Sequence, residues 1–137
     1  MPDAPSLLSR GGARAVDAFL LAVLGVAWGY PLDYSLVWLV AHALLVYGSF
    51  VAGDALVGGT PGKAALGLRV VGADGEAPSW AAAAKREAFV LLGAVPFVGP
   101  LIALGVWAWI ARDVSTRDDR RGVHDRFAGG TEVVSAR

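Results

Sequence analysis

Cysteine is absent from this sequence of 137 residues. Its absence excludes disulfide bonds, metal sites built from thiolates and a cysteine nucleophile. An excess of charge of either sign is also missing, because twelve acidic residues balance twelve basic residues. A chain without a net positive field has no general attraction for nucleic acid, so we expect no nucleic-acid partner.

A complete phosphate-binding loop is missing as well, although the stretch GGTPGK at residues 58–63 suggests one at first. A P-loop requires a glycine at the position of Val57 and a serine or threonine at the position of Ala64. The adjacent residues His124 and Asp125 make a poor metal site, since no second histidine lies nearby. We therefore predict no metal, no other cofactor and no enzymatic activity.

Apolar residues are abundant. They make up 55% of the chain, and the mean hydropathy is +0.54. Both values exceed what a soluble domain of this size usually carries, and the length fits one domain. We predict a single membrane domain over residues 1–137, with residues 1–8 disordered and residues 131–137 forming a short strand and tail.

Two apolar runs lie within residues 15–62, where no lysine or arginine occurs. A transmembrane helix needs about 20 residues. Residues 35–57 supply this length, and the first run reaches it if its helix begins near Arg10. The runs predict two transmembrane helices joined at residues 31–34. A cleaved signal peptide is an alternative for the first run, but Asp17 interrupts it and a second run follows at once.

Charge distribution predicts the orientation of this hairpin. All basic residues precede the first run, lie within residues 63–86 or follow residue 111, and the connector at residues 31–34 has none. By the positive-inside rule the connector lies outside the cell, and both termini lie in the cytoplasm. Four aromatic residues flank the connector as an interfacial belt would, with core packing as the alternative: Trp28, Tyr30, Tyr34 and Trp38.

A third apolar run covers residues 88–111 and contains Pro96, Gly99 and Pro100 near its middle. Proline removes a helical hydrogen bond and clashes with the preceding turn. We therefore predict two helices, about Trp80–Val95 and Pro100–Arg112, that fold back at residues 96–99 as a short or re-entrant pair. Non-helical backbone at membrane depth requires cover from protein or water, so the bend should pack against the first two helices.

Residues 58–75 are then predicted to lie beside the cytoplasmic end of the second span. Thr60 and Pro61 are typical of a helix start, and residues 68–71 alternate as a strand does. A second strand-like piece occupies residues 131–134. Short strands need partners for their backbone groups, so we predict that the two pair antiparallel. The pairing would place Asp125 within reach of one of three basic residues: Lys63, Arg69 or Arg86.

In these motifs the chain resembles the RDD family of bacterial integral membrane proteins, over nearly its whole length. Arg10 precedes Asp17 by seven residues, as in the first motif of that family. An acidic residue, Asp54, stands nine positions before Lys63 in GGTPGKAALGLRVV. Later matches are Arg86 and the closing sequence HDRFAGGTEVV, which contains one extra glycine and begins at His124. We take Asp125 as the second aspartate of the family name.

The resemblance implies a multi-pass protein of the bacterial inner membrane, and transport of unidentified ligands has been suggested for the family. It implies an all-α membrane protein with a two-stranded β element on the cytoplasmic side. Because so few helices can hardly enclose a transport pathway, we expect the partner to be another copy of the chain, in a homo-oligomer, or another membrane protein. The alternative is an accessory or scaffolding protein that binds lipid or a partner through its cytoplasmic basic loops.

A buried charge site is expected independently of the resemblance. Arg10, Arg14 and Asp17 share one helical face, which predicts that Asp17 pairs with one of the arginines, and Asp54 lies at a similar depth. Charges inside a membrane cost about 2.5–3.5 kcal/mol each, so they should meet partners. The pairs could form an ion or solute site or a structural latch. His42 fits a hydrogen-bonded packing residue better than a proton carrier.

Overall fold

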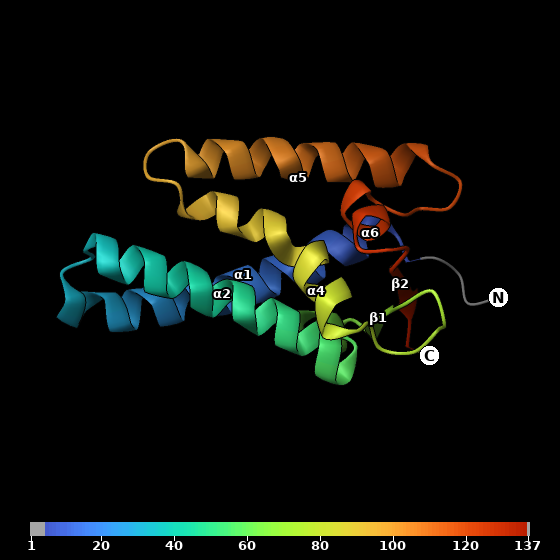
Figure 1. The fold of residues 1–137 in the computed structure, drawn as a ribbon, viewed down its shortest axis with the longest axis horizontal. Coiled ribbons are helices and arrows are strands. Elements are labelled where there is room, and N and C mark those ends of the chain that lie inside the picture. The colour runs from blue at the N-terminus through green and yellow to red at the C-terminus, as the bar shows by residue number, and fades with distance from the viewer. Residues whose placement is uncertain (1–4, 137) are drawn as a thin grey trace.

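The computed structural model describes residues 5–136, which fold mainly into helices (Figure 1). The disorder predicted for residues 1–8 does not include Leu7 and Leu8, which begin the first helix, and residues 1–4 lie outside the described residues. The elements are α1 (Leu7–Gly29), η1 (Tyr30–Leu32), α2 (Leu36–Val57), α3 (Pro61–Ala65), β1 (Leu68–Val71), α4 (Trp80–Glu87), η2 (Ala88–Ala94), α5 (Gly99–Thr116), α6 (Val123–Phe127) and β2 (Glu132–Ser135).

Helices α1 and α2 form the predicted hairpin. Ser6 caps α1 by accepting a hydrogen bond of 3.1 Å from the amide of Ser9, and Gly58 ends α2 with a φ of 71°. Both helices are long and apolar enough to cross a bilayer. Only 17% and 11% of their most apolar windows are buried within the chain, so these are not the core helices of a soluble protein.

The tip of the hairpin is closed by aromatic packing around His42. Asp33 and Tyr34 turn the chain with φ values of 51° and 47°. The rings of Trp38 and His42 stack with an interplanar angle of 4°, and Trp28 Nε1 donates a hydrogen bond of 3.2 Å to His42 Nδ1. The hydrogen-bonded packing role predicted for His42 is therefore confirmed, and these tryptophans pack within the hairpin as well as flanking its turn.

The third apolar run folds back, as its prolines predict. The first arm is α-helical only to Glu87 and continues as the 3₁₀-helix η2, where a single helix to Val95 was expected. The turn follows at residues 95–98, with Phe97 at a φ of 66°. Helix α5 then returns beside η2 and extends to Thr116, four residues beyond the expected end (Figure 1). Helix α4 therefore begins, and helix α5 ends, at the same end of the molecule (Figure 1).

Strands β1 and β2 form an antiparallel pair, which confirms the predicted pairing. The register joins Leu68 to Ser135 and Val71 to Glu132, so the second strand begins one residue later than expected. The inward side chains of the sheet pack on α1 in a small apolar core of Ala13, Leu68, Val70 and Val133. The sheet is thus attached to the start of the first membrane helix.

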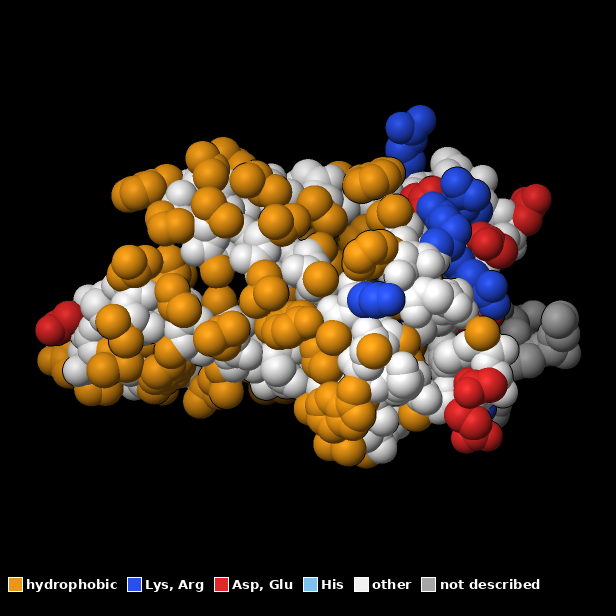
Figure 2. Space-filling view, viewed as in Figure 1, with side chains coloured by type: hydrophobic (Ala, Val, Ile, Leu, Met, Phe, Trp, Pro, Cys, Tyr) orange, Lys and Arg blue, Asp and Glu red, His pale blue; other side chains and the backbone are white. Residues whose placement is uncertain are grey.

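The end of the molecule that holds α3, β1, α6 and β2 is hereafter the polar end. Figure 2 shows basic and acidic side chains gathered there, whereas apolar side chains cover the visible surface of the long helices. The start of α1 and strand β2 also lie at the polar end (Figure 1). This arrangement separates one charged cap from an apolar body of helices.

Helix α3 docks on α1 at a distance that only glycine allows. A Cβ added at Gly62 would lie 2.1 Å from the carbonyl oxygen of Ala13 and 2.9 Å from the carboxylate of Asp17. Both groups belong to the rigid backbone or to a buried side chain, so they cannot move aside. The glycine before Lys63 therefore serves helix packing here.

Replacing Gly62 by alanine should destabilise the fold, because the new methyl group overlaps the α1 backbone. We expect Gly62→Ala to lower the free energy of unfolding by about 1–3 kcal/mol or more, the usual range for overpacking. Denaturant titration of the protein in micelles measures this loss. Gly48→Ala is the matched control, since nothing lies within 4 Å of its added Cβ. Equal effects of the two substitutions would contradict the close packing.

Candidate functional site

Asp17 caps helix α3 from the neighbouring helix α1. Its Oδ1 accepts a hydrogen bond of 2.7 Å from the amide of Gly62, and its Oδ2 accepts one from the hydroxyl of Thr60. A carboxylate at a helix N-terminus satisfies free amides and interacts well with the helix dipole. The predicted pairing of Asp17 with Arg10 or Arg14 is wrong. Asp17 accepts its hydrogen bonds from Thr60 and Gly62, whereas the two arginines donate to other groups.

Arg86, at the end of α4, is the centre of the charge network. Its side chain is buried and its Nη1 donates hydrogen bonds to Asp125 Oδ1 and, at 3.2 Å, to Thr131 Oγ1. Its Nε lies 3.3 Å from Asp54 Oδ2 and 3.6 Å from Glu87 Oε1. One guanidinium therefore contacts acids from α2, α4 and α6. The predicted contact between Asp125 and Arg86 is confirmed.

Two further ion pairs complete the network. Lys63 Nζ lies 2.5 Å from Asp54 Oδ1, and Arg14 donates a hydrogen bond to Glu87. The guanidinium carbon of Arg14 lies 3.9 Å from the ring centroid of Phe50, which is typical of a cation–π contact. Three basic and three acidic residues are thus paired in the interior: Arg14, Lys63 and Arg86 with Asp54, Glu87 and Asp125.

Arg10 and Arg69 play other parts than an ion pair with the aspartates. Arg10 donates hydrogen bonds to the backbone carbonyls of Arg120, at 2.9 Å, and Val133, at 3.2 Å, so it ties α1 to the C-terminal segment. Arg69 is exposed on β1 opposite Val134, and Asp125 is paired with Arg86 instead. Of the three basic residues predicted as alternatives near Asp125, Arg86 is the one that pairs with it.

Among the network residues outside α1 and α2, the pKa shifts favour the charged forms of Arg86, Glu87 and Asp125 and disfavour that of Lys63. Burial raises the pKa of Glu87, but Arg14, Lys63 and Arg86 outweigh it and hold that pKa at about 2. Burial likewise opposes ionisation of Asp125, while Arg86 brings its pKa below the usual value. Burial lowers the pKa of Lys63, an effect that Asp54 opposes. The two acids therefore remain ionised at neutral pH, and Arg86 remains cationic.

Glu87 is the functional candidate that sequence reasoning misses. It follows Lys85 and Arg86 in a short charged run at a helix end, a pattern typical of a solvent-exposed interface. In the fold it is fully buried. The available signal was the helical spacing, because position 87 lies one turn after Ala83 and Ala84 on the packed face of α4.

Several buried polar atoms in the network and beside it make no hydrogen bond within the described chain. Three of them, Asp54 Oδ2, Arg86 Nε and Glu87 Oε1, face one another in the ion pairs described above. The others beside the cavity are Arg10 Nε, Arg14 Nη1 and His124 Nδ1, and buried polar groups are normally satisfied, so a further polar group would gain interaction energy there. Residues 5–136 contain no group of three or more His, Asp and Glu placed to hold a metal ion.

A cavity of about 190 Å³ adjoins the network between α1, α5 and the sheet. Every titratable residue in its lining is basic, whereas the three network carboxylates lie behind that lining. The remaining walls are mainly apolar and include Phe89, Trp107 and Ile110. The basic residues of the lining are Arg10, Arg14, Lys63, Arg86 and His124.

These features define a small helical membrane protein with two apolar helices and a charged cap. The RDD family model matches residues 4–129, and the chain belongs to the RDD family. The matched region holds every residue of the charge network apart from Thr131, and strand β2 follows it. No curated protein and no solved structure matches the chain.

Acid should weaken the cap through His124. Burial, with Arg86 adding to it, lowers the pKa of His124 to about 4 from 6.5. The unfolded chain therefore binds a proton first, and stability present above pH 6.5 is lost as the pH falls towards 4. At about 1.4 kcal/mol per pKa unit, the loss approaches about 3 kcal/mol.

Unfolding measured between pH 7 and 4.5 tests this effect, because Glu87 and Asp125 titrate below that window. The matched variant His124→Gln should show a flatter dependence over the same range. An identical slope in both proteins would show that another group is responsible.

Proposed function

We propose that this chain is a multi-pass protein of the bacterial inner membrane with its polar end in the cytoplasm. Membership of the RDD family and two apolar helices support a membrane protein. The basic residues gather at the polar end, and the connector at residues 31–34 carries none. The positive-inside rule then favours an external connector. Helices α4 and α5 enter and leave at the polar end, which preserves this orientation.

Accessibility of single cysteines in intact cells tests the orientation. The natural chain has no cysteine, so each probe reports one site. A membrane-impermeant maleimide should label Asp33→Cys from outside and should label Ala136→Cys only after the cells are opened. Labelling of Ala136→Cys in intact cells would contradict a hairpin of η2 and α5 that returns to the cytoplasm.

We propose further that the protein is a transport component for an ion or small solute. The observation that carries this proposal is the unsatisfied charge network beside the cavity. Arg14 lines the cavity and has one buried atom, Nη1, without a hydrogen bond, while its Nη2 donates to Glu87, which does not line the cavity. An entering ion or solute would interact with Arg14 and exchange for part of the Arg14–Glu87 pair. Clusters of buried charges with shifted pKa values often mark functional sites.

A route for the solute is suggested by two further cavities. One, of about 250 Å³, shares Arg14 and Trp107 with the first and reaches His42. The next, of about 200 Å³, shares His42, Val46 and Val90 with the second. The series runs between α1, α2 and η2 towards the tip of the hairpin. Its walls are mostly apolar, so a second copy of the chain or another membrane protein would complete a polar pathway.

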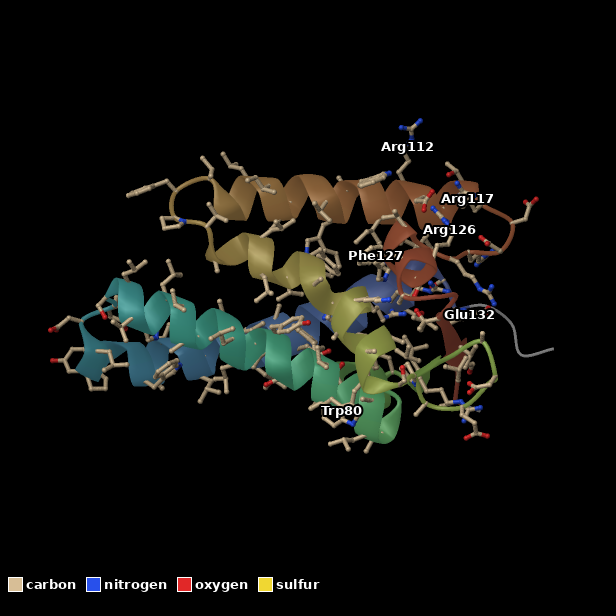
Figure 3. All side chains as sticks on the ribbon, in the orientation of Figure 1. Trp80, Arg112, Arg117, Arg126, Phe127 and Glu132 are labelled. Atoms are coloured by element: carbon tan, nitrogen blue, oxygen red, sulfur yellow. The ribbon has the colours of Figure 1, made fainter. Side chains whose placement is uncertain are left out.

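An accessory or scaffolding role is the second candidate, and the surface of the polar end favours it. Figure 3 shows Arg112 at the end of α5 pointing away from the body of the molecule. Arg117 and Arg126 both pair with Asp113, and the exposed aromatic side chain of Phe127 follows on α6. Basic and aromatic side chains together suit the interface of an anionic membrane. In this role the charge network acts only as a latch.

Flux in reconstituted vesicles separates the two roles. Purified protein should carry protons, alkali cations or small anions faster than protein-free vesicles. Glu87→Gln preserves shape but leaves Arg14 unpaired, and flux should fall to background. Because that variant can fail to fold, the double variant Arg14→Gln, Glu87→Gln removes both charges and should be folded and inactive. Arg112→Gln, on the exposed surface, should retain flux.

Asp17→Asn provides the complementary measurement. Asp17 caps α3, so its loss of charge should chiefly lower the unfolding temperature, while vesicles with correctly inserted protein keep their flux. Wild-type protein that carries none of these ions would contradict transport and favour the accessory role. Undiminished flux in the folded double variant would remove the network from the pathway.

A further inference from the structure

The cavity beside the charge network has two kinds of wall. Four permanently or usually cationic side chains line one part, and aromatic and aliphatic side chains line the rest, including Phe89, Trp107 and Val114. The matching carboxylates of Asp54 and Glu87 do not line it. A ligand that fits both parts carries a negative head and an apolar body.

Two arginines of the lining each have a buried donor without a hydrogen bond. Arg14 uses Nη2 for Glu87 and has Nη1 buried without a hydrogen bond. Arg10 uses both terminal nitrogens for backbone carbonyls and has Nε buried without one. Arginine donors bind carboxylate and phosphate oxygens with charge-assisted hydrogen bonds. An anionic head in the cavity would therefore satisfy these donors once the side chains turn them towards it.

An apolar chain attached to such a head also has a place to lie. The second cavity begins where the first meets Arg14 and Trp107, and its walls include Leu21, Val46 and Val90. The third continues past His42 between Leu39 and Ala94. A hydrated inorganic ion gains little from these walls, whereas an alkyl chain is as compatible with them as with the lipid around the protein.

We infer that the cavity binds an anionic amphiphile, with a carboxylate or phosphate head at Arg10 and Arg14 and an alkyl chain along the groove between α1, α2 and η2. This inference names a ligand class for the cavity used in the transport proposal and rests on that proposal only for movement across the membrane. Leu7 and Gly11, both exposed, form part of the rim through which the head would enter.

Quenching of tryptophan fluorescence by bromine tests the inference with the full chain in phosphatidylcholine nanodiscs. The probes are a brominated alkyl carboxylate, an alkyl phosphate of equal chain length and the corresponding alcohol. Both anions should quench saturably, and Trp107→Phe should remove the saturable part, because Trp107 lines the first two cavities. The alcohol should bind at least about tenfold more weakly, since it lacks the charge-assisted hydrogen bonds.

Two variants with one control locate the site. Arg10→Gln should weaken binding of both anions about tenfold, while Arg112→Gln on the exposed surface should not. Gly11→Leu changes no charge, has open space at its Cβ and should obstruct the cavity. Equal affinity for the alcohol, or full binding by both Arg10→Gln and Gly11→Leu, would overturn the inference.

The two anionic probes also distinguish the source of the ligand. Preference for the carboxylate indicates a fatty acid, and preference for the phosphate indicates a lipid headgroup; either supports the inference. Movement of the probe between vesicles and their interior is measured separately. Saturable binding of the probe without its movement would support the inferred ligand class and contradict transport. Flux of inorganic ions without binding of the amphiphile would support transport and contradict the inferred ligand class.

Discussion

The buried guanidinium of Arg86 is the contact on which the polar end depends. It reaches Asp54 at the end of α2, Glu87 beside it on α4, and Asp125 on α6. No other described residue joins the α1–α2 hairpin to the C-terminal segment through as many charged partners. Removal of a partner from a buried ion pair costs about 3–5 kcal/mol, because a charge remains without compensation. The network therefore couples α2, α4 and α6.

Asp17 and the sequence GGTPGK show how a phosphate-binding pattern can serve an internal anion. A helix N-terminus with free amides attracts negative charge whatever its source. In this chain the anion is a carboxylate from α1, held by the amide of Gly62 and the hydroxyl of Thr60. Because Gly62 has no side chain, the carboxylate of Asp17 can come close to its backbone amide. Glycine permits a phosphate to approach the backbone in the same way in phosphate-binding loops.

Much of the fold could be predicted because its signals are local. Uncharged apolar runs predicted α1 and α2, Pro96 and its neighbours predicted the bend, and two alternating segments predicted the sheet. The partners of individual charges depended on tertiary contacts that no spacing reveals. Helical spacing placed Asp17 beside Arg14, but α3 presents an amide and a hydroxyl to Asp17, and Glu87 on α4 attracts Arg14. Strand β2 begins at Glu132, one residue later than the alternation of the sequence predicted.

The span of chain between Arg86 and its partner Asp125 has a consequence for synthesis. These residues are 39 positions apart, and Arg10 lies 123 positions from Val133, whose carbonyl it binds. At about 5–20 residues per second, a ribosome needs roughly 2–8 s to go from Arg86 to Asp125. During that interval the first two helices are already available for insertion while Arg86 still lacks one of its acids. The nascent protein thus passes through a stage in which the charge of Arg86 is incompletely neutralised.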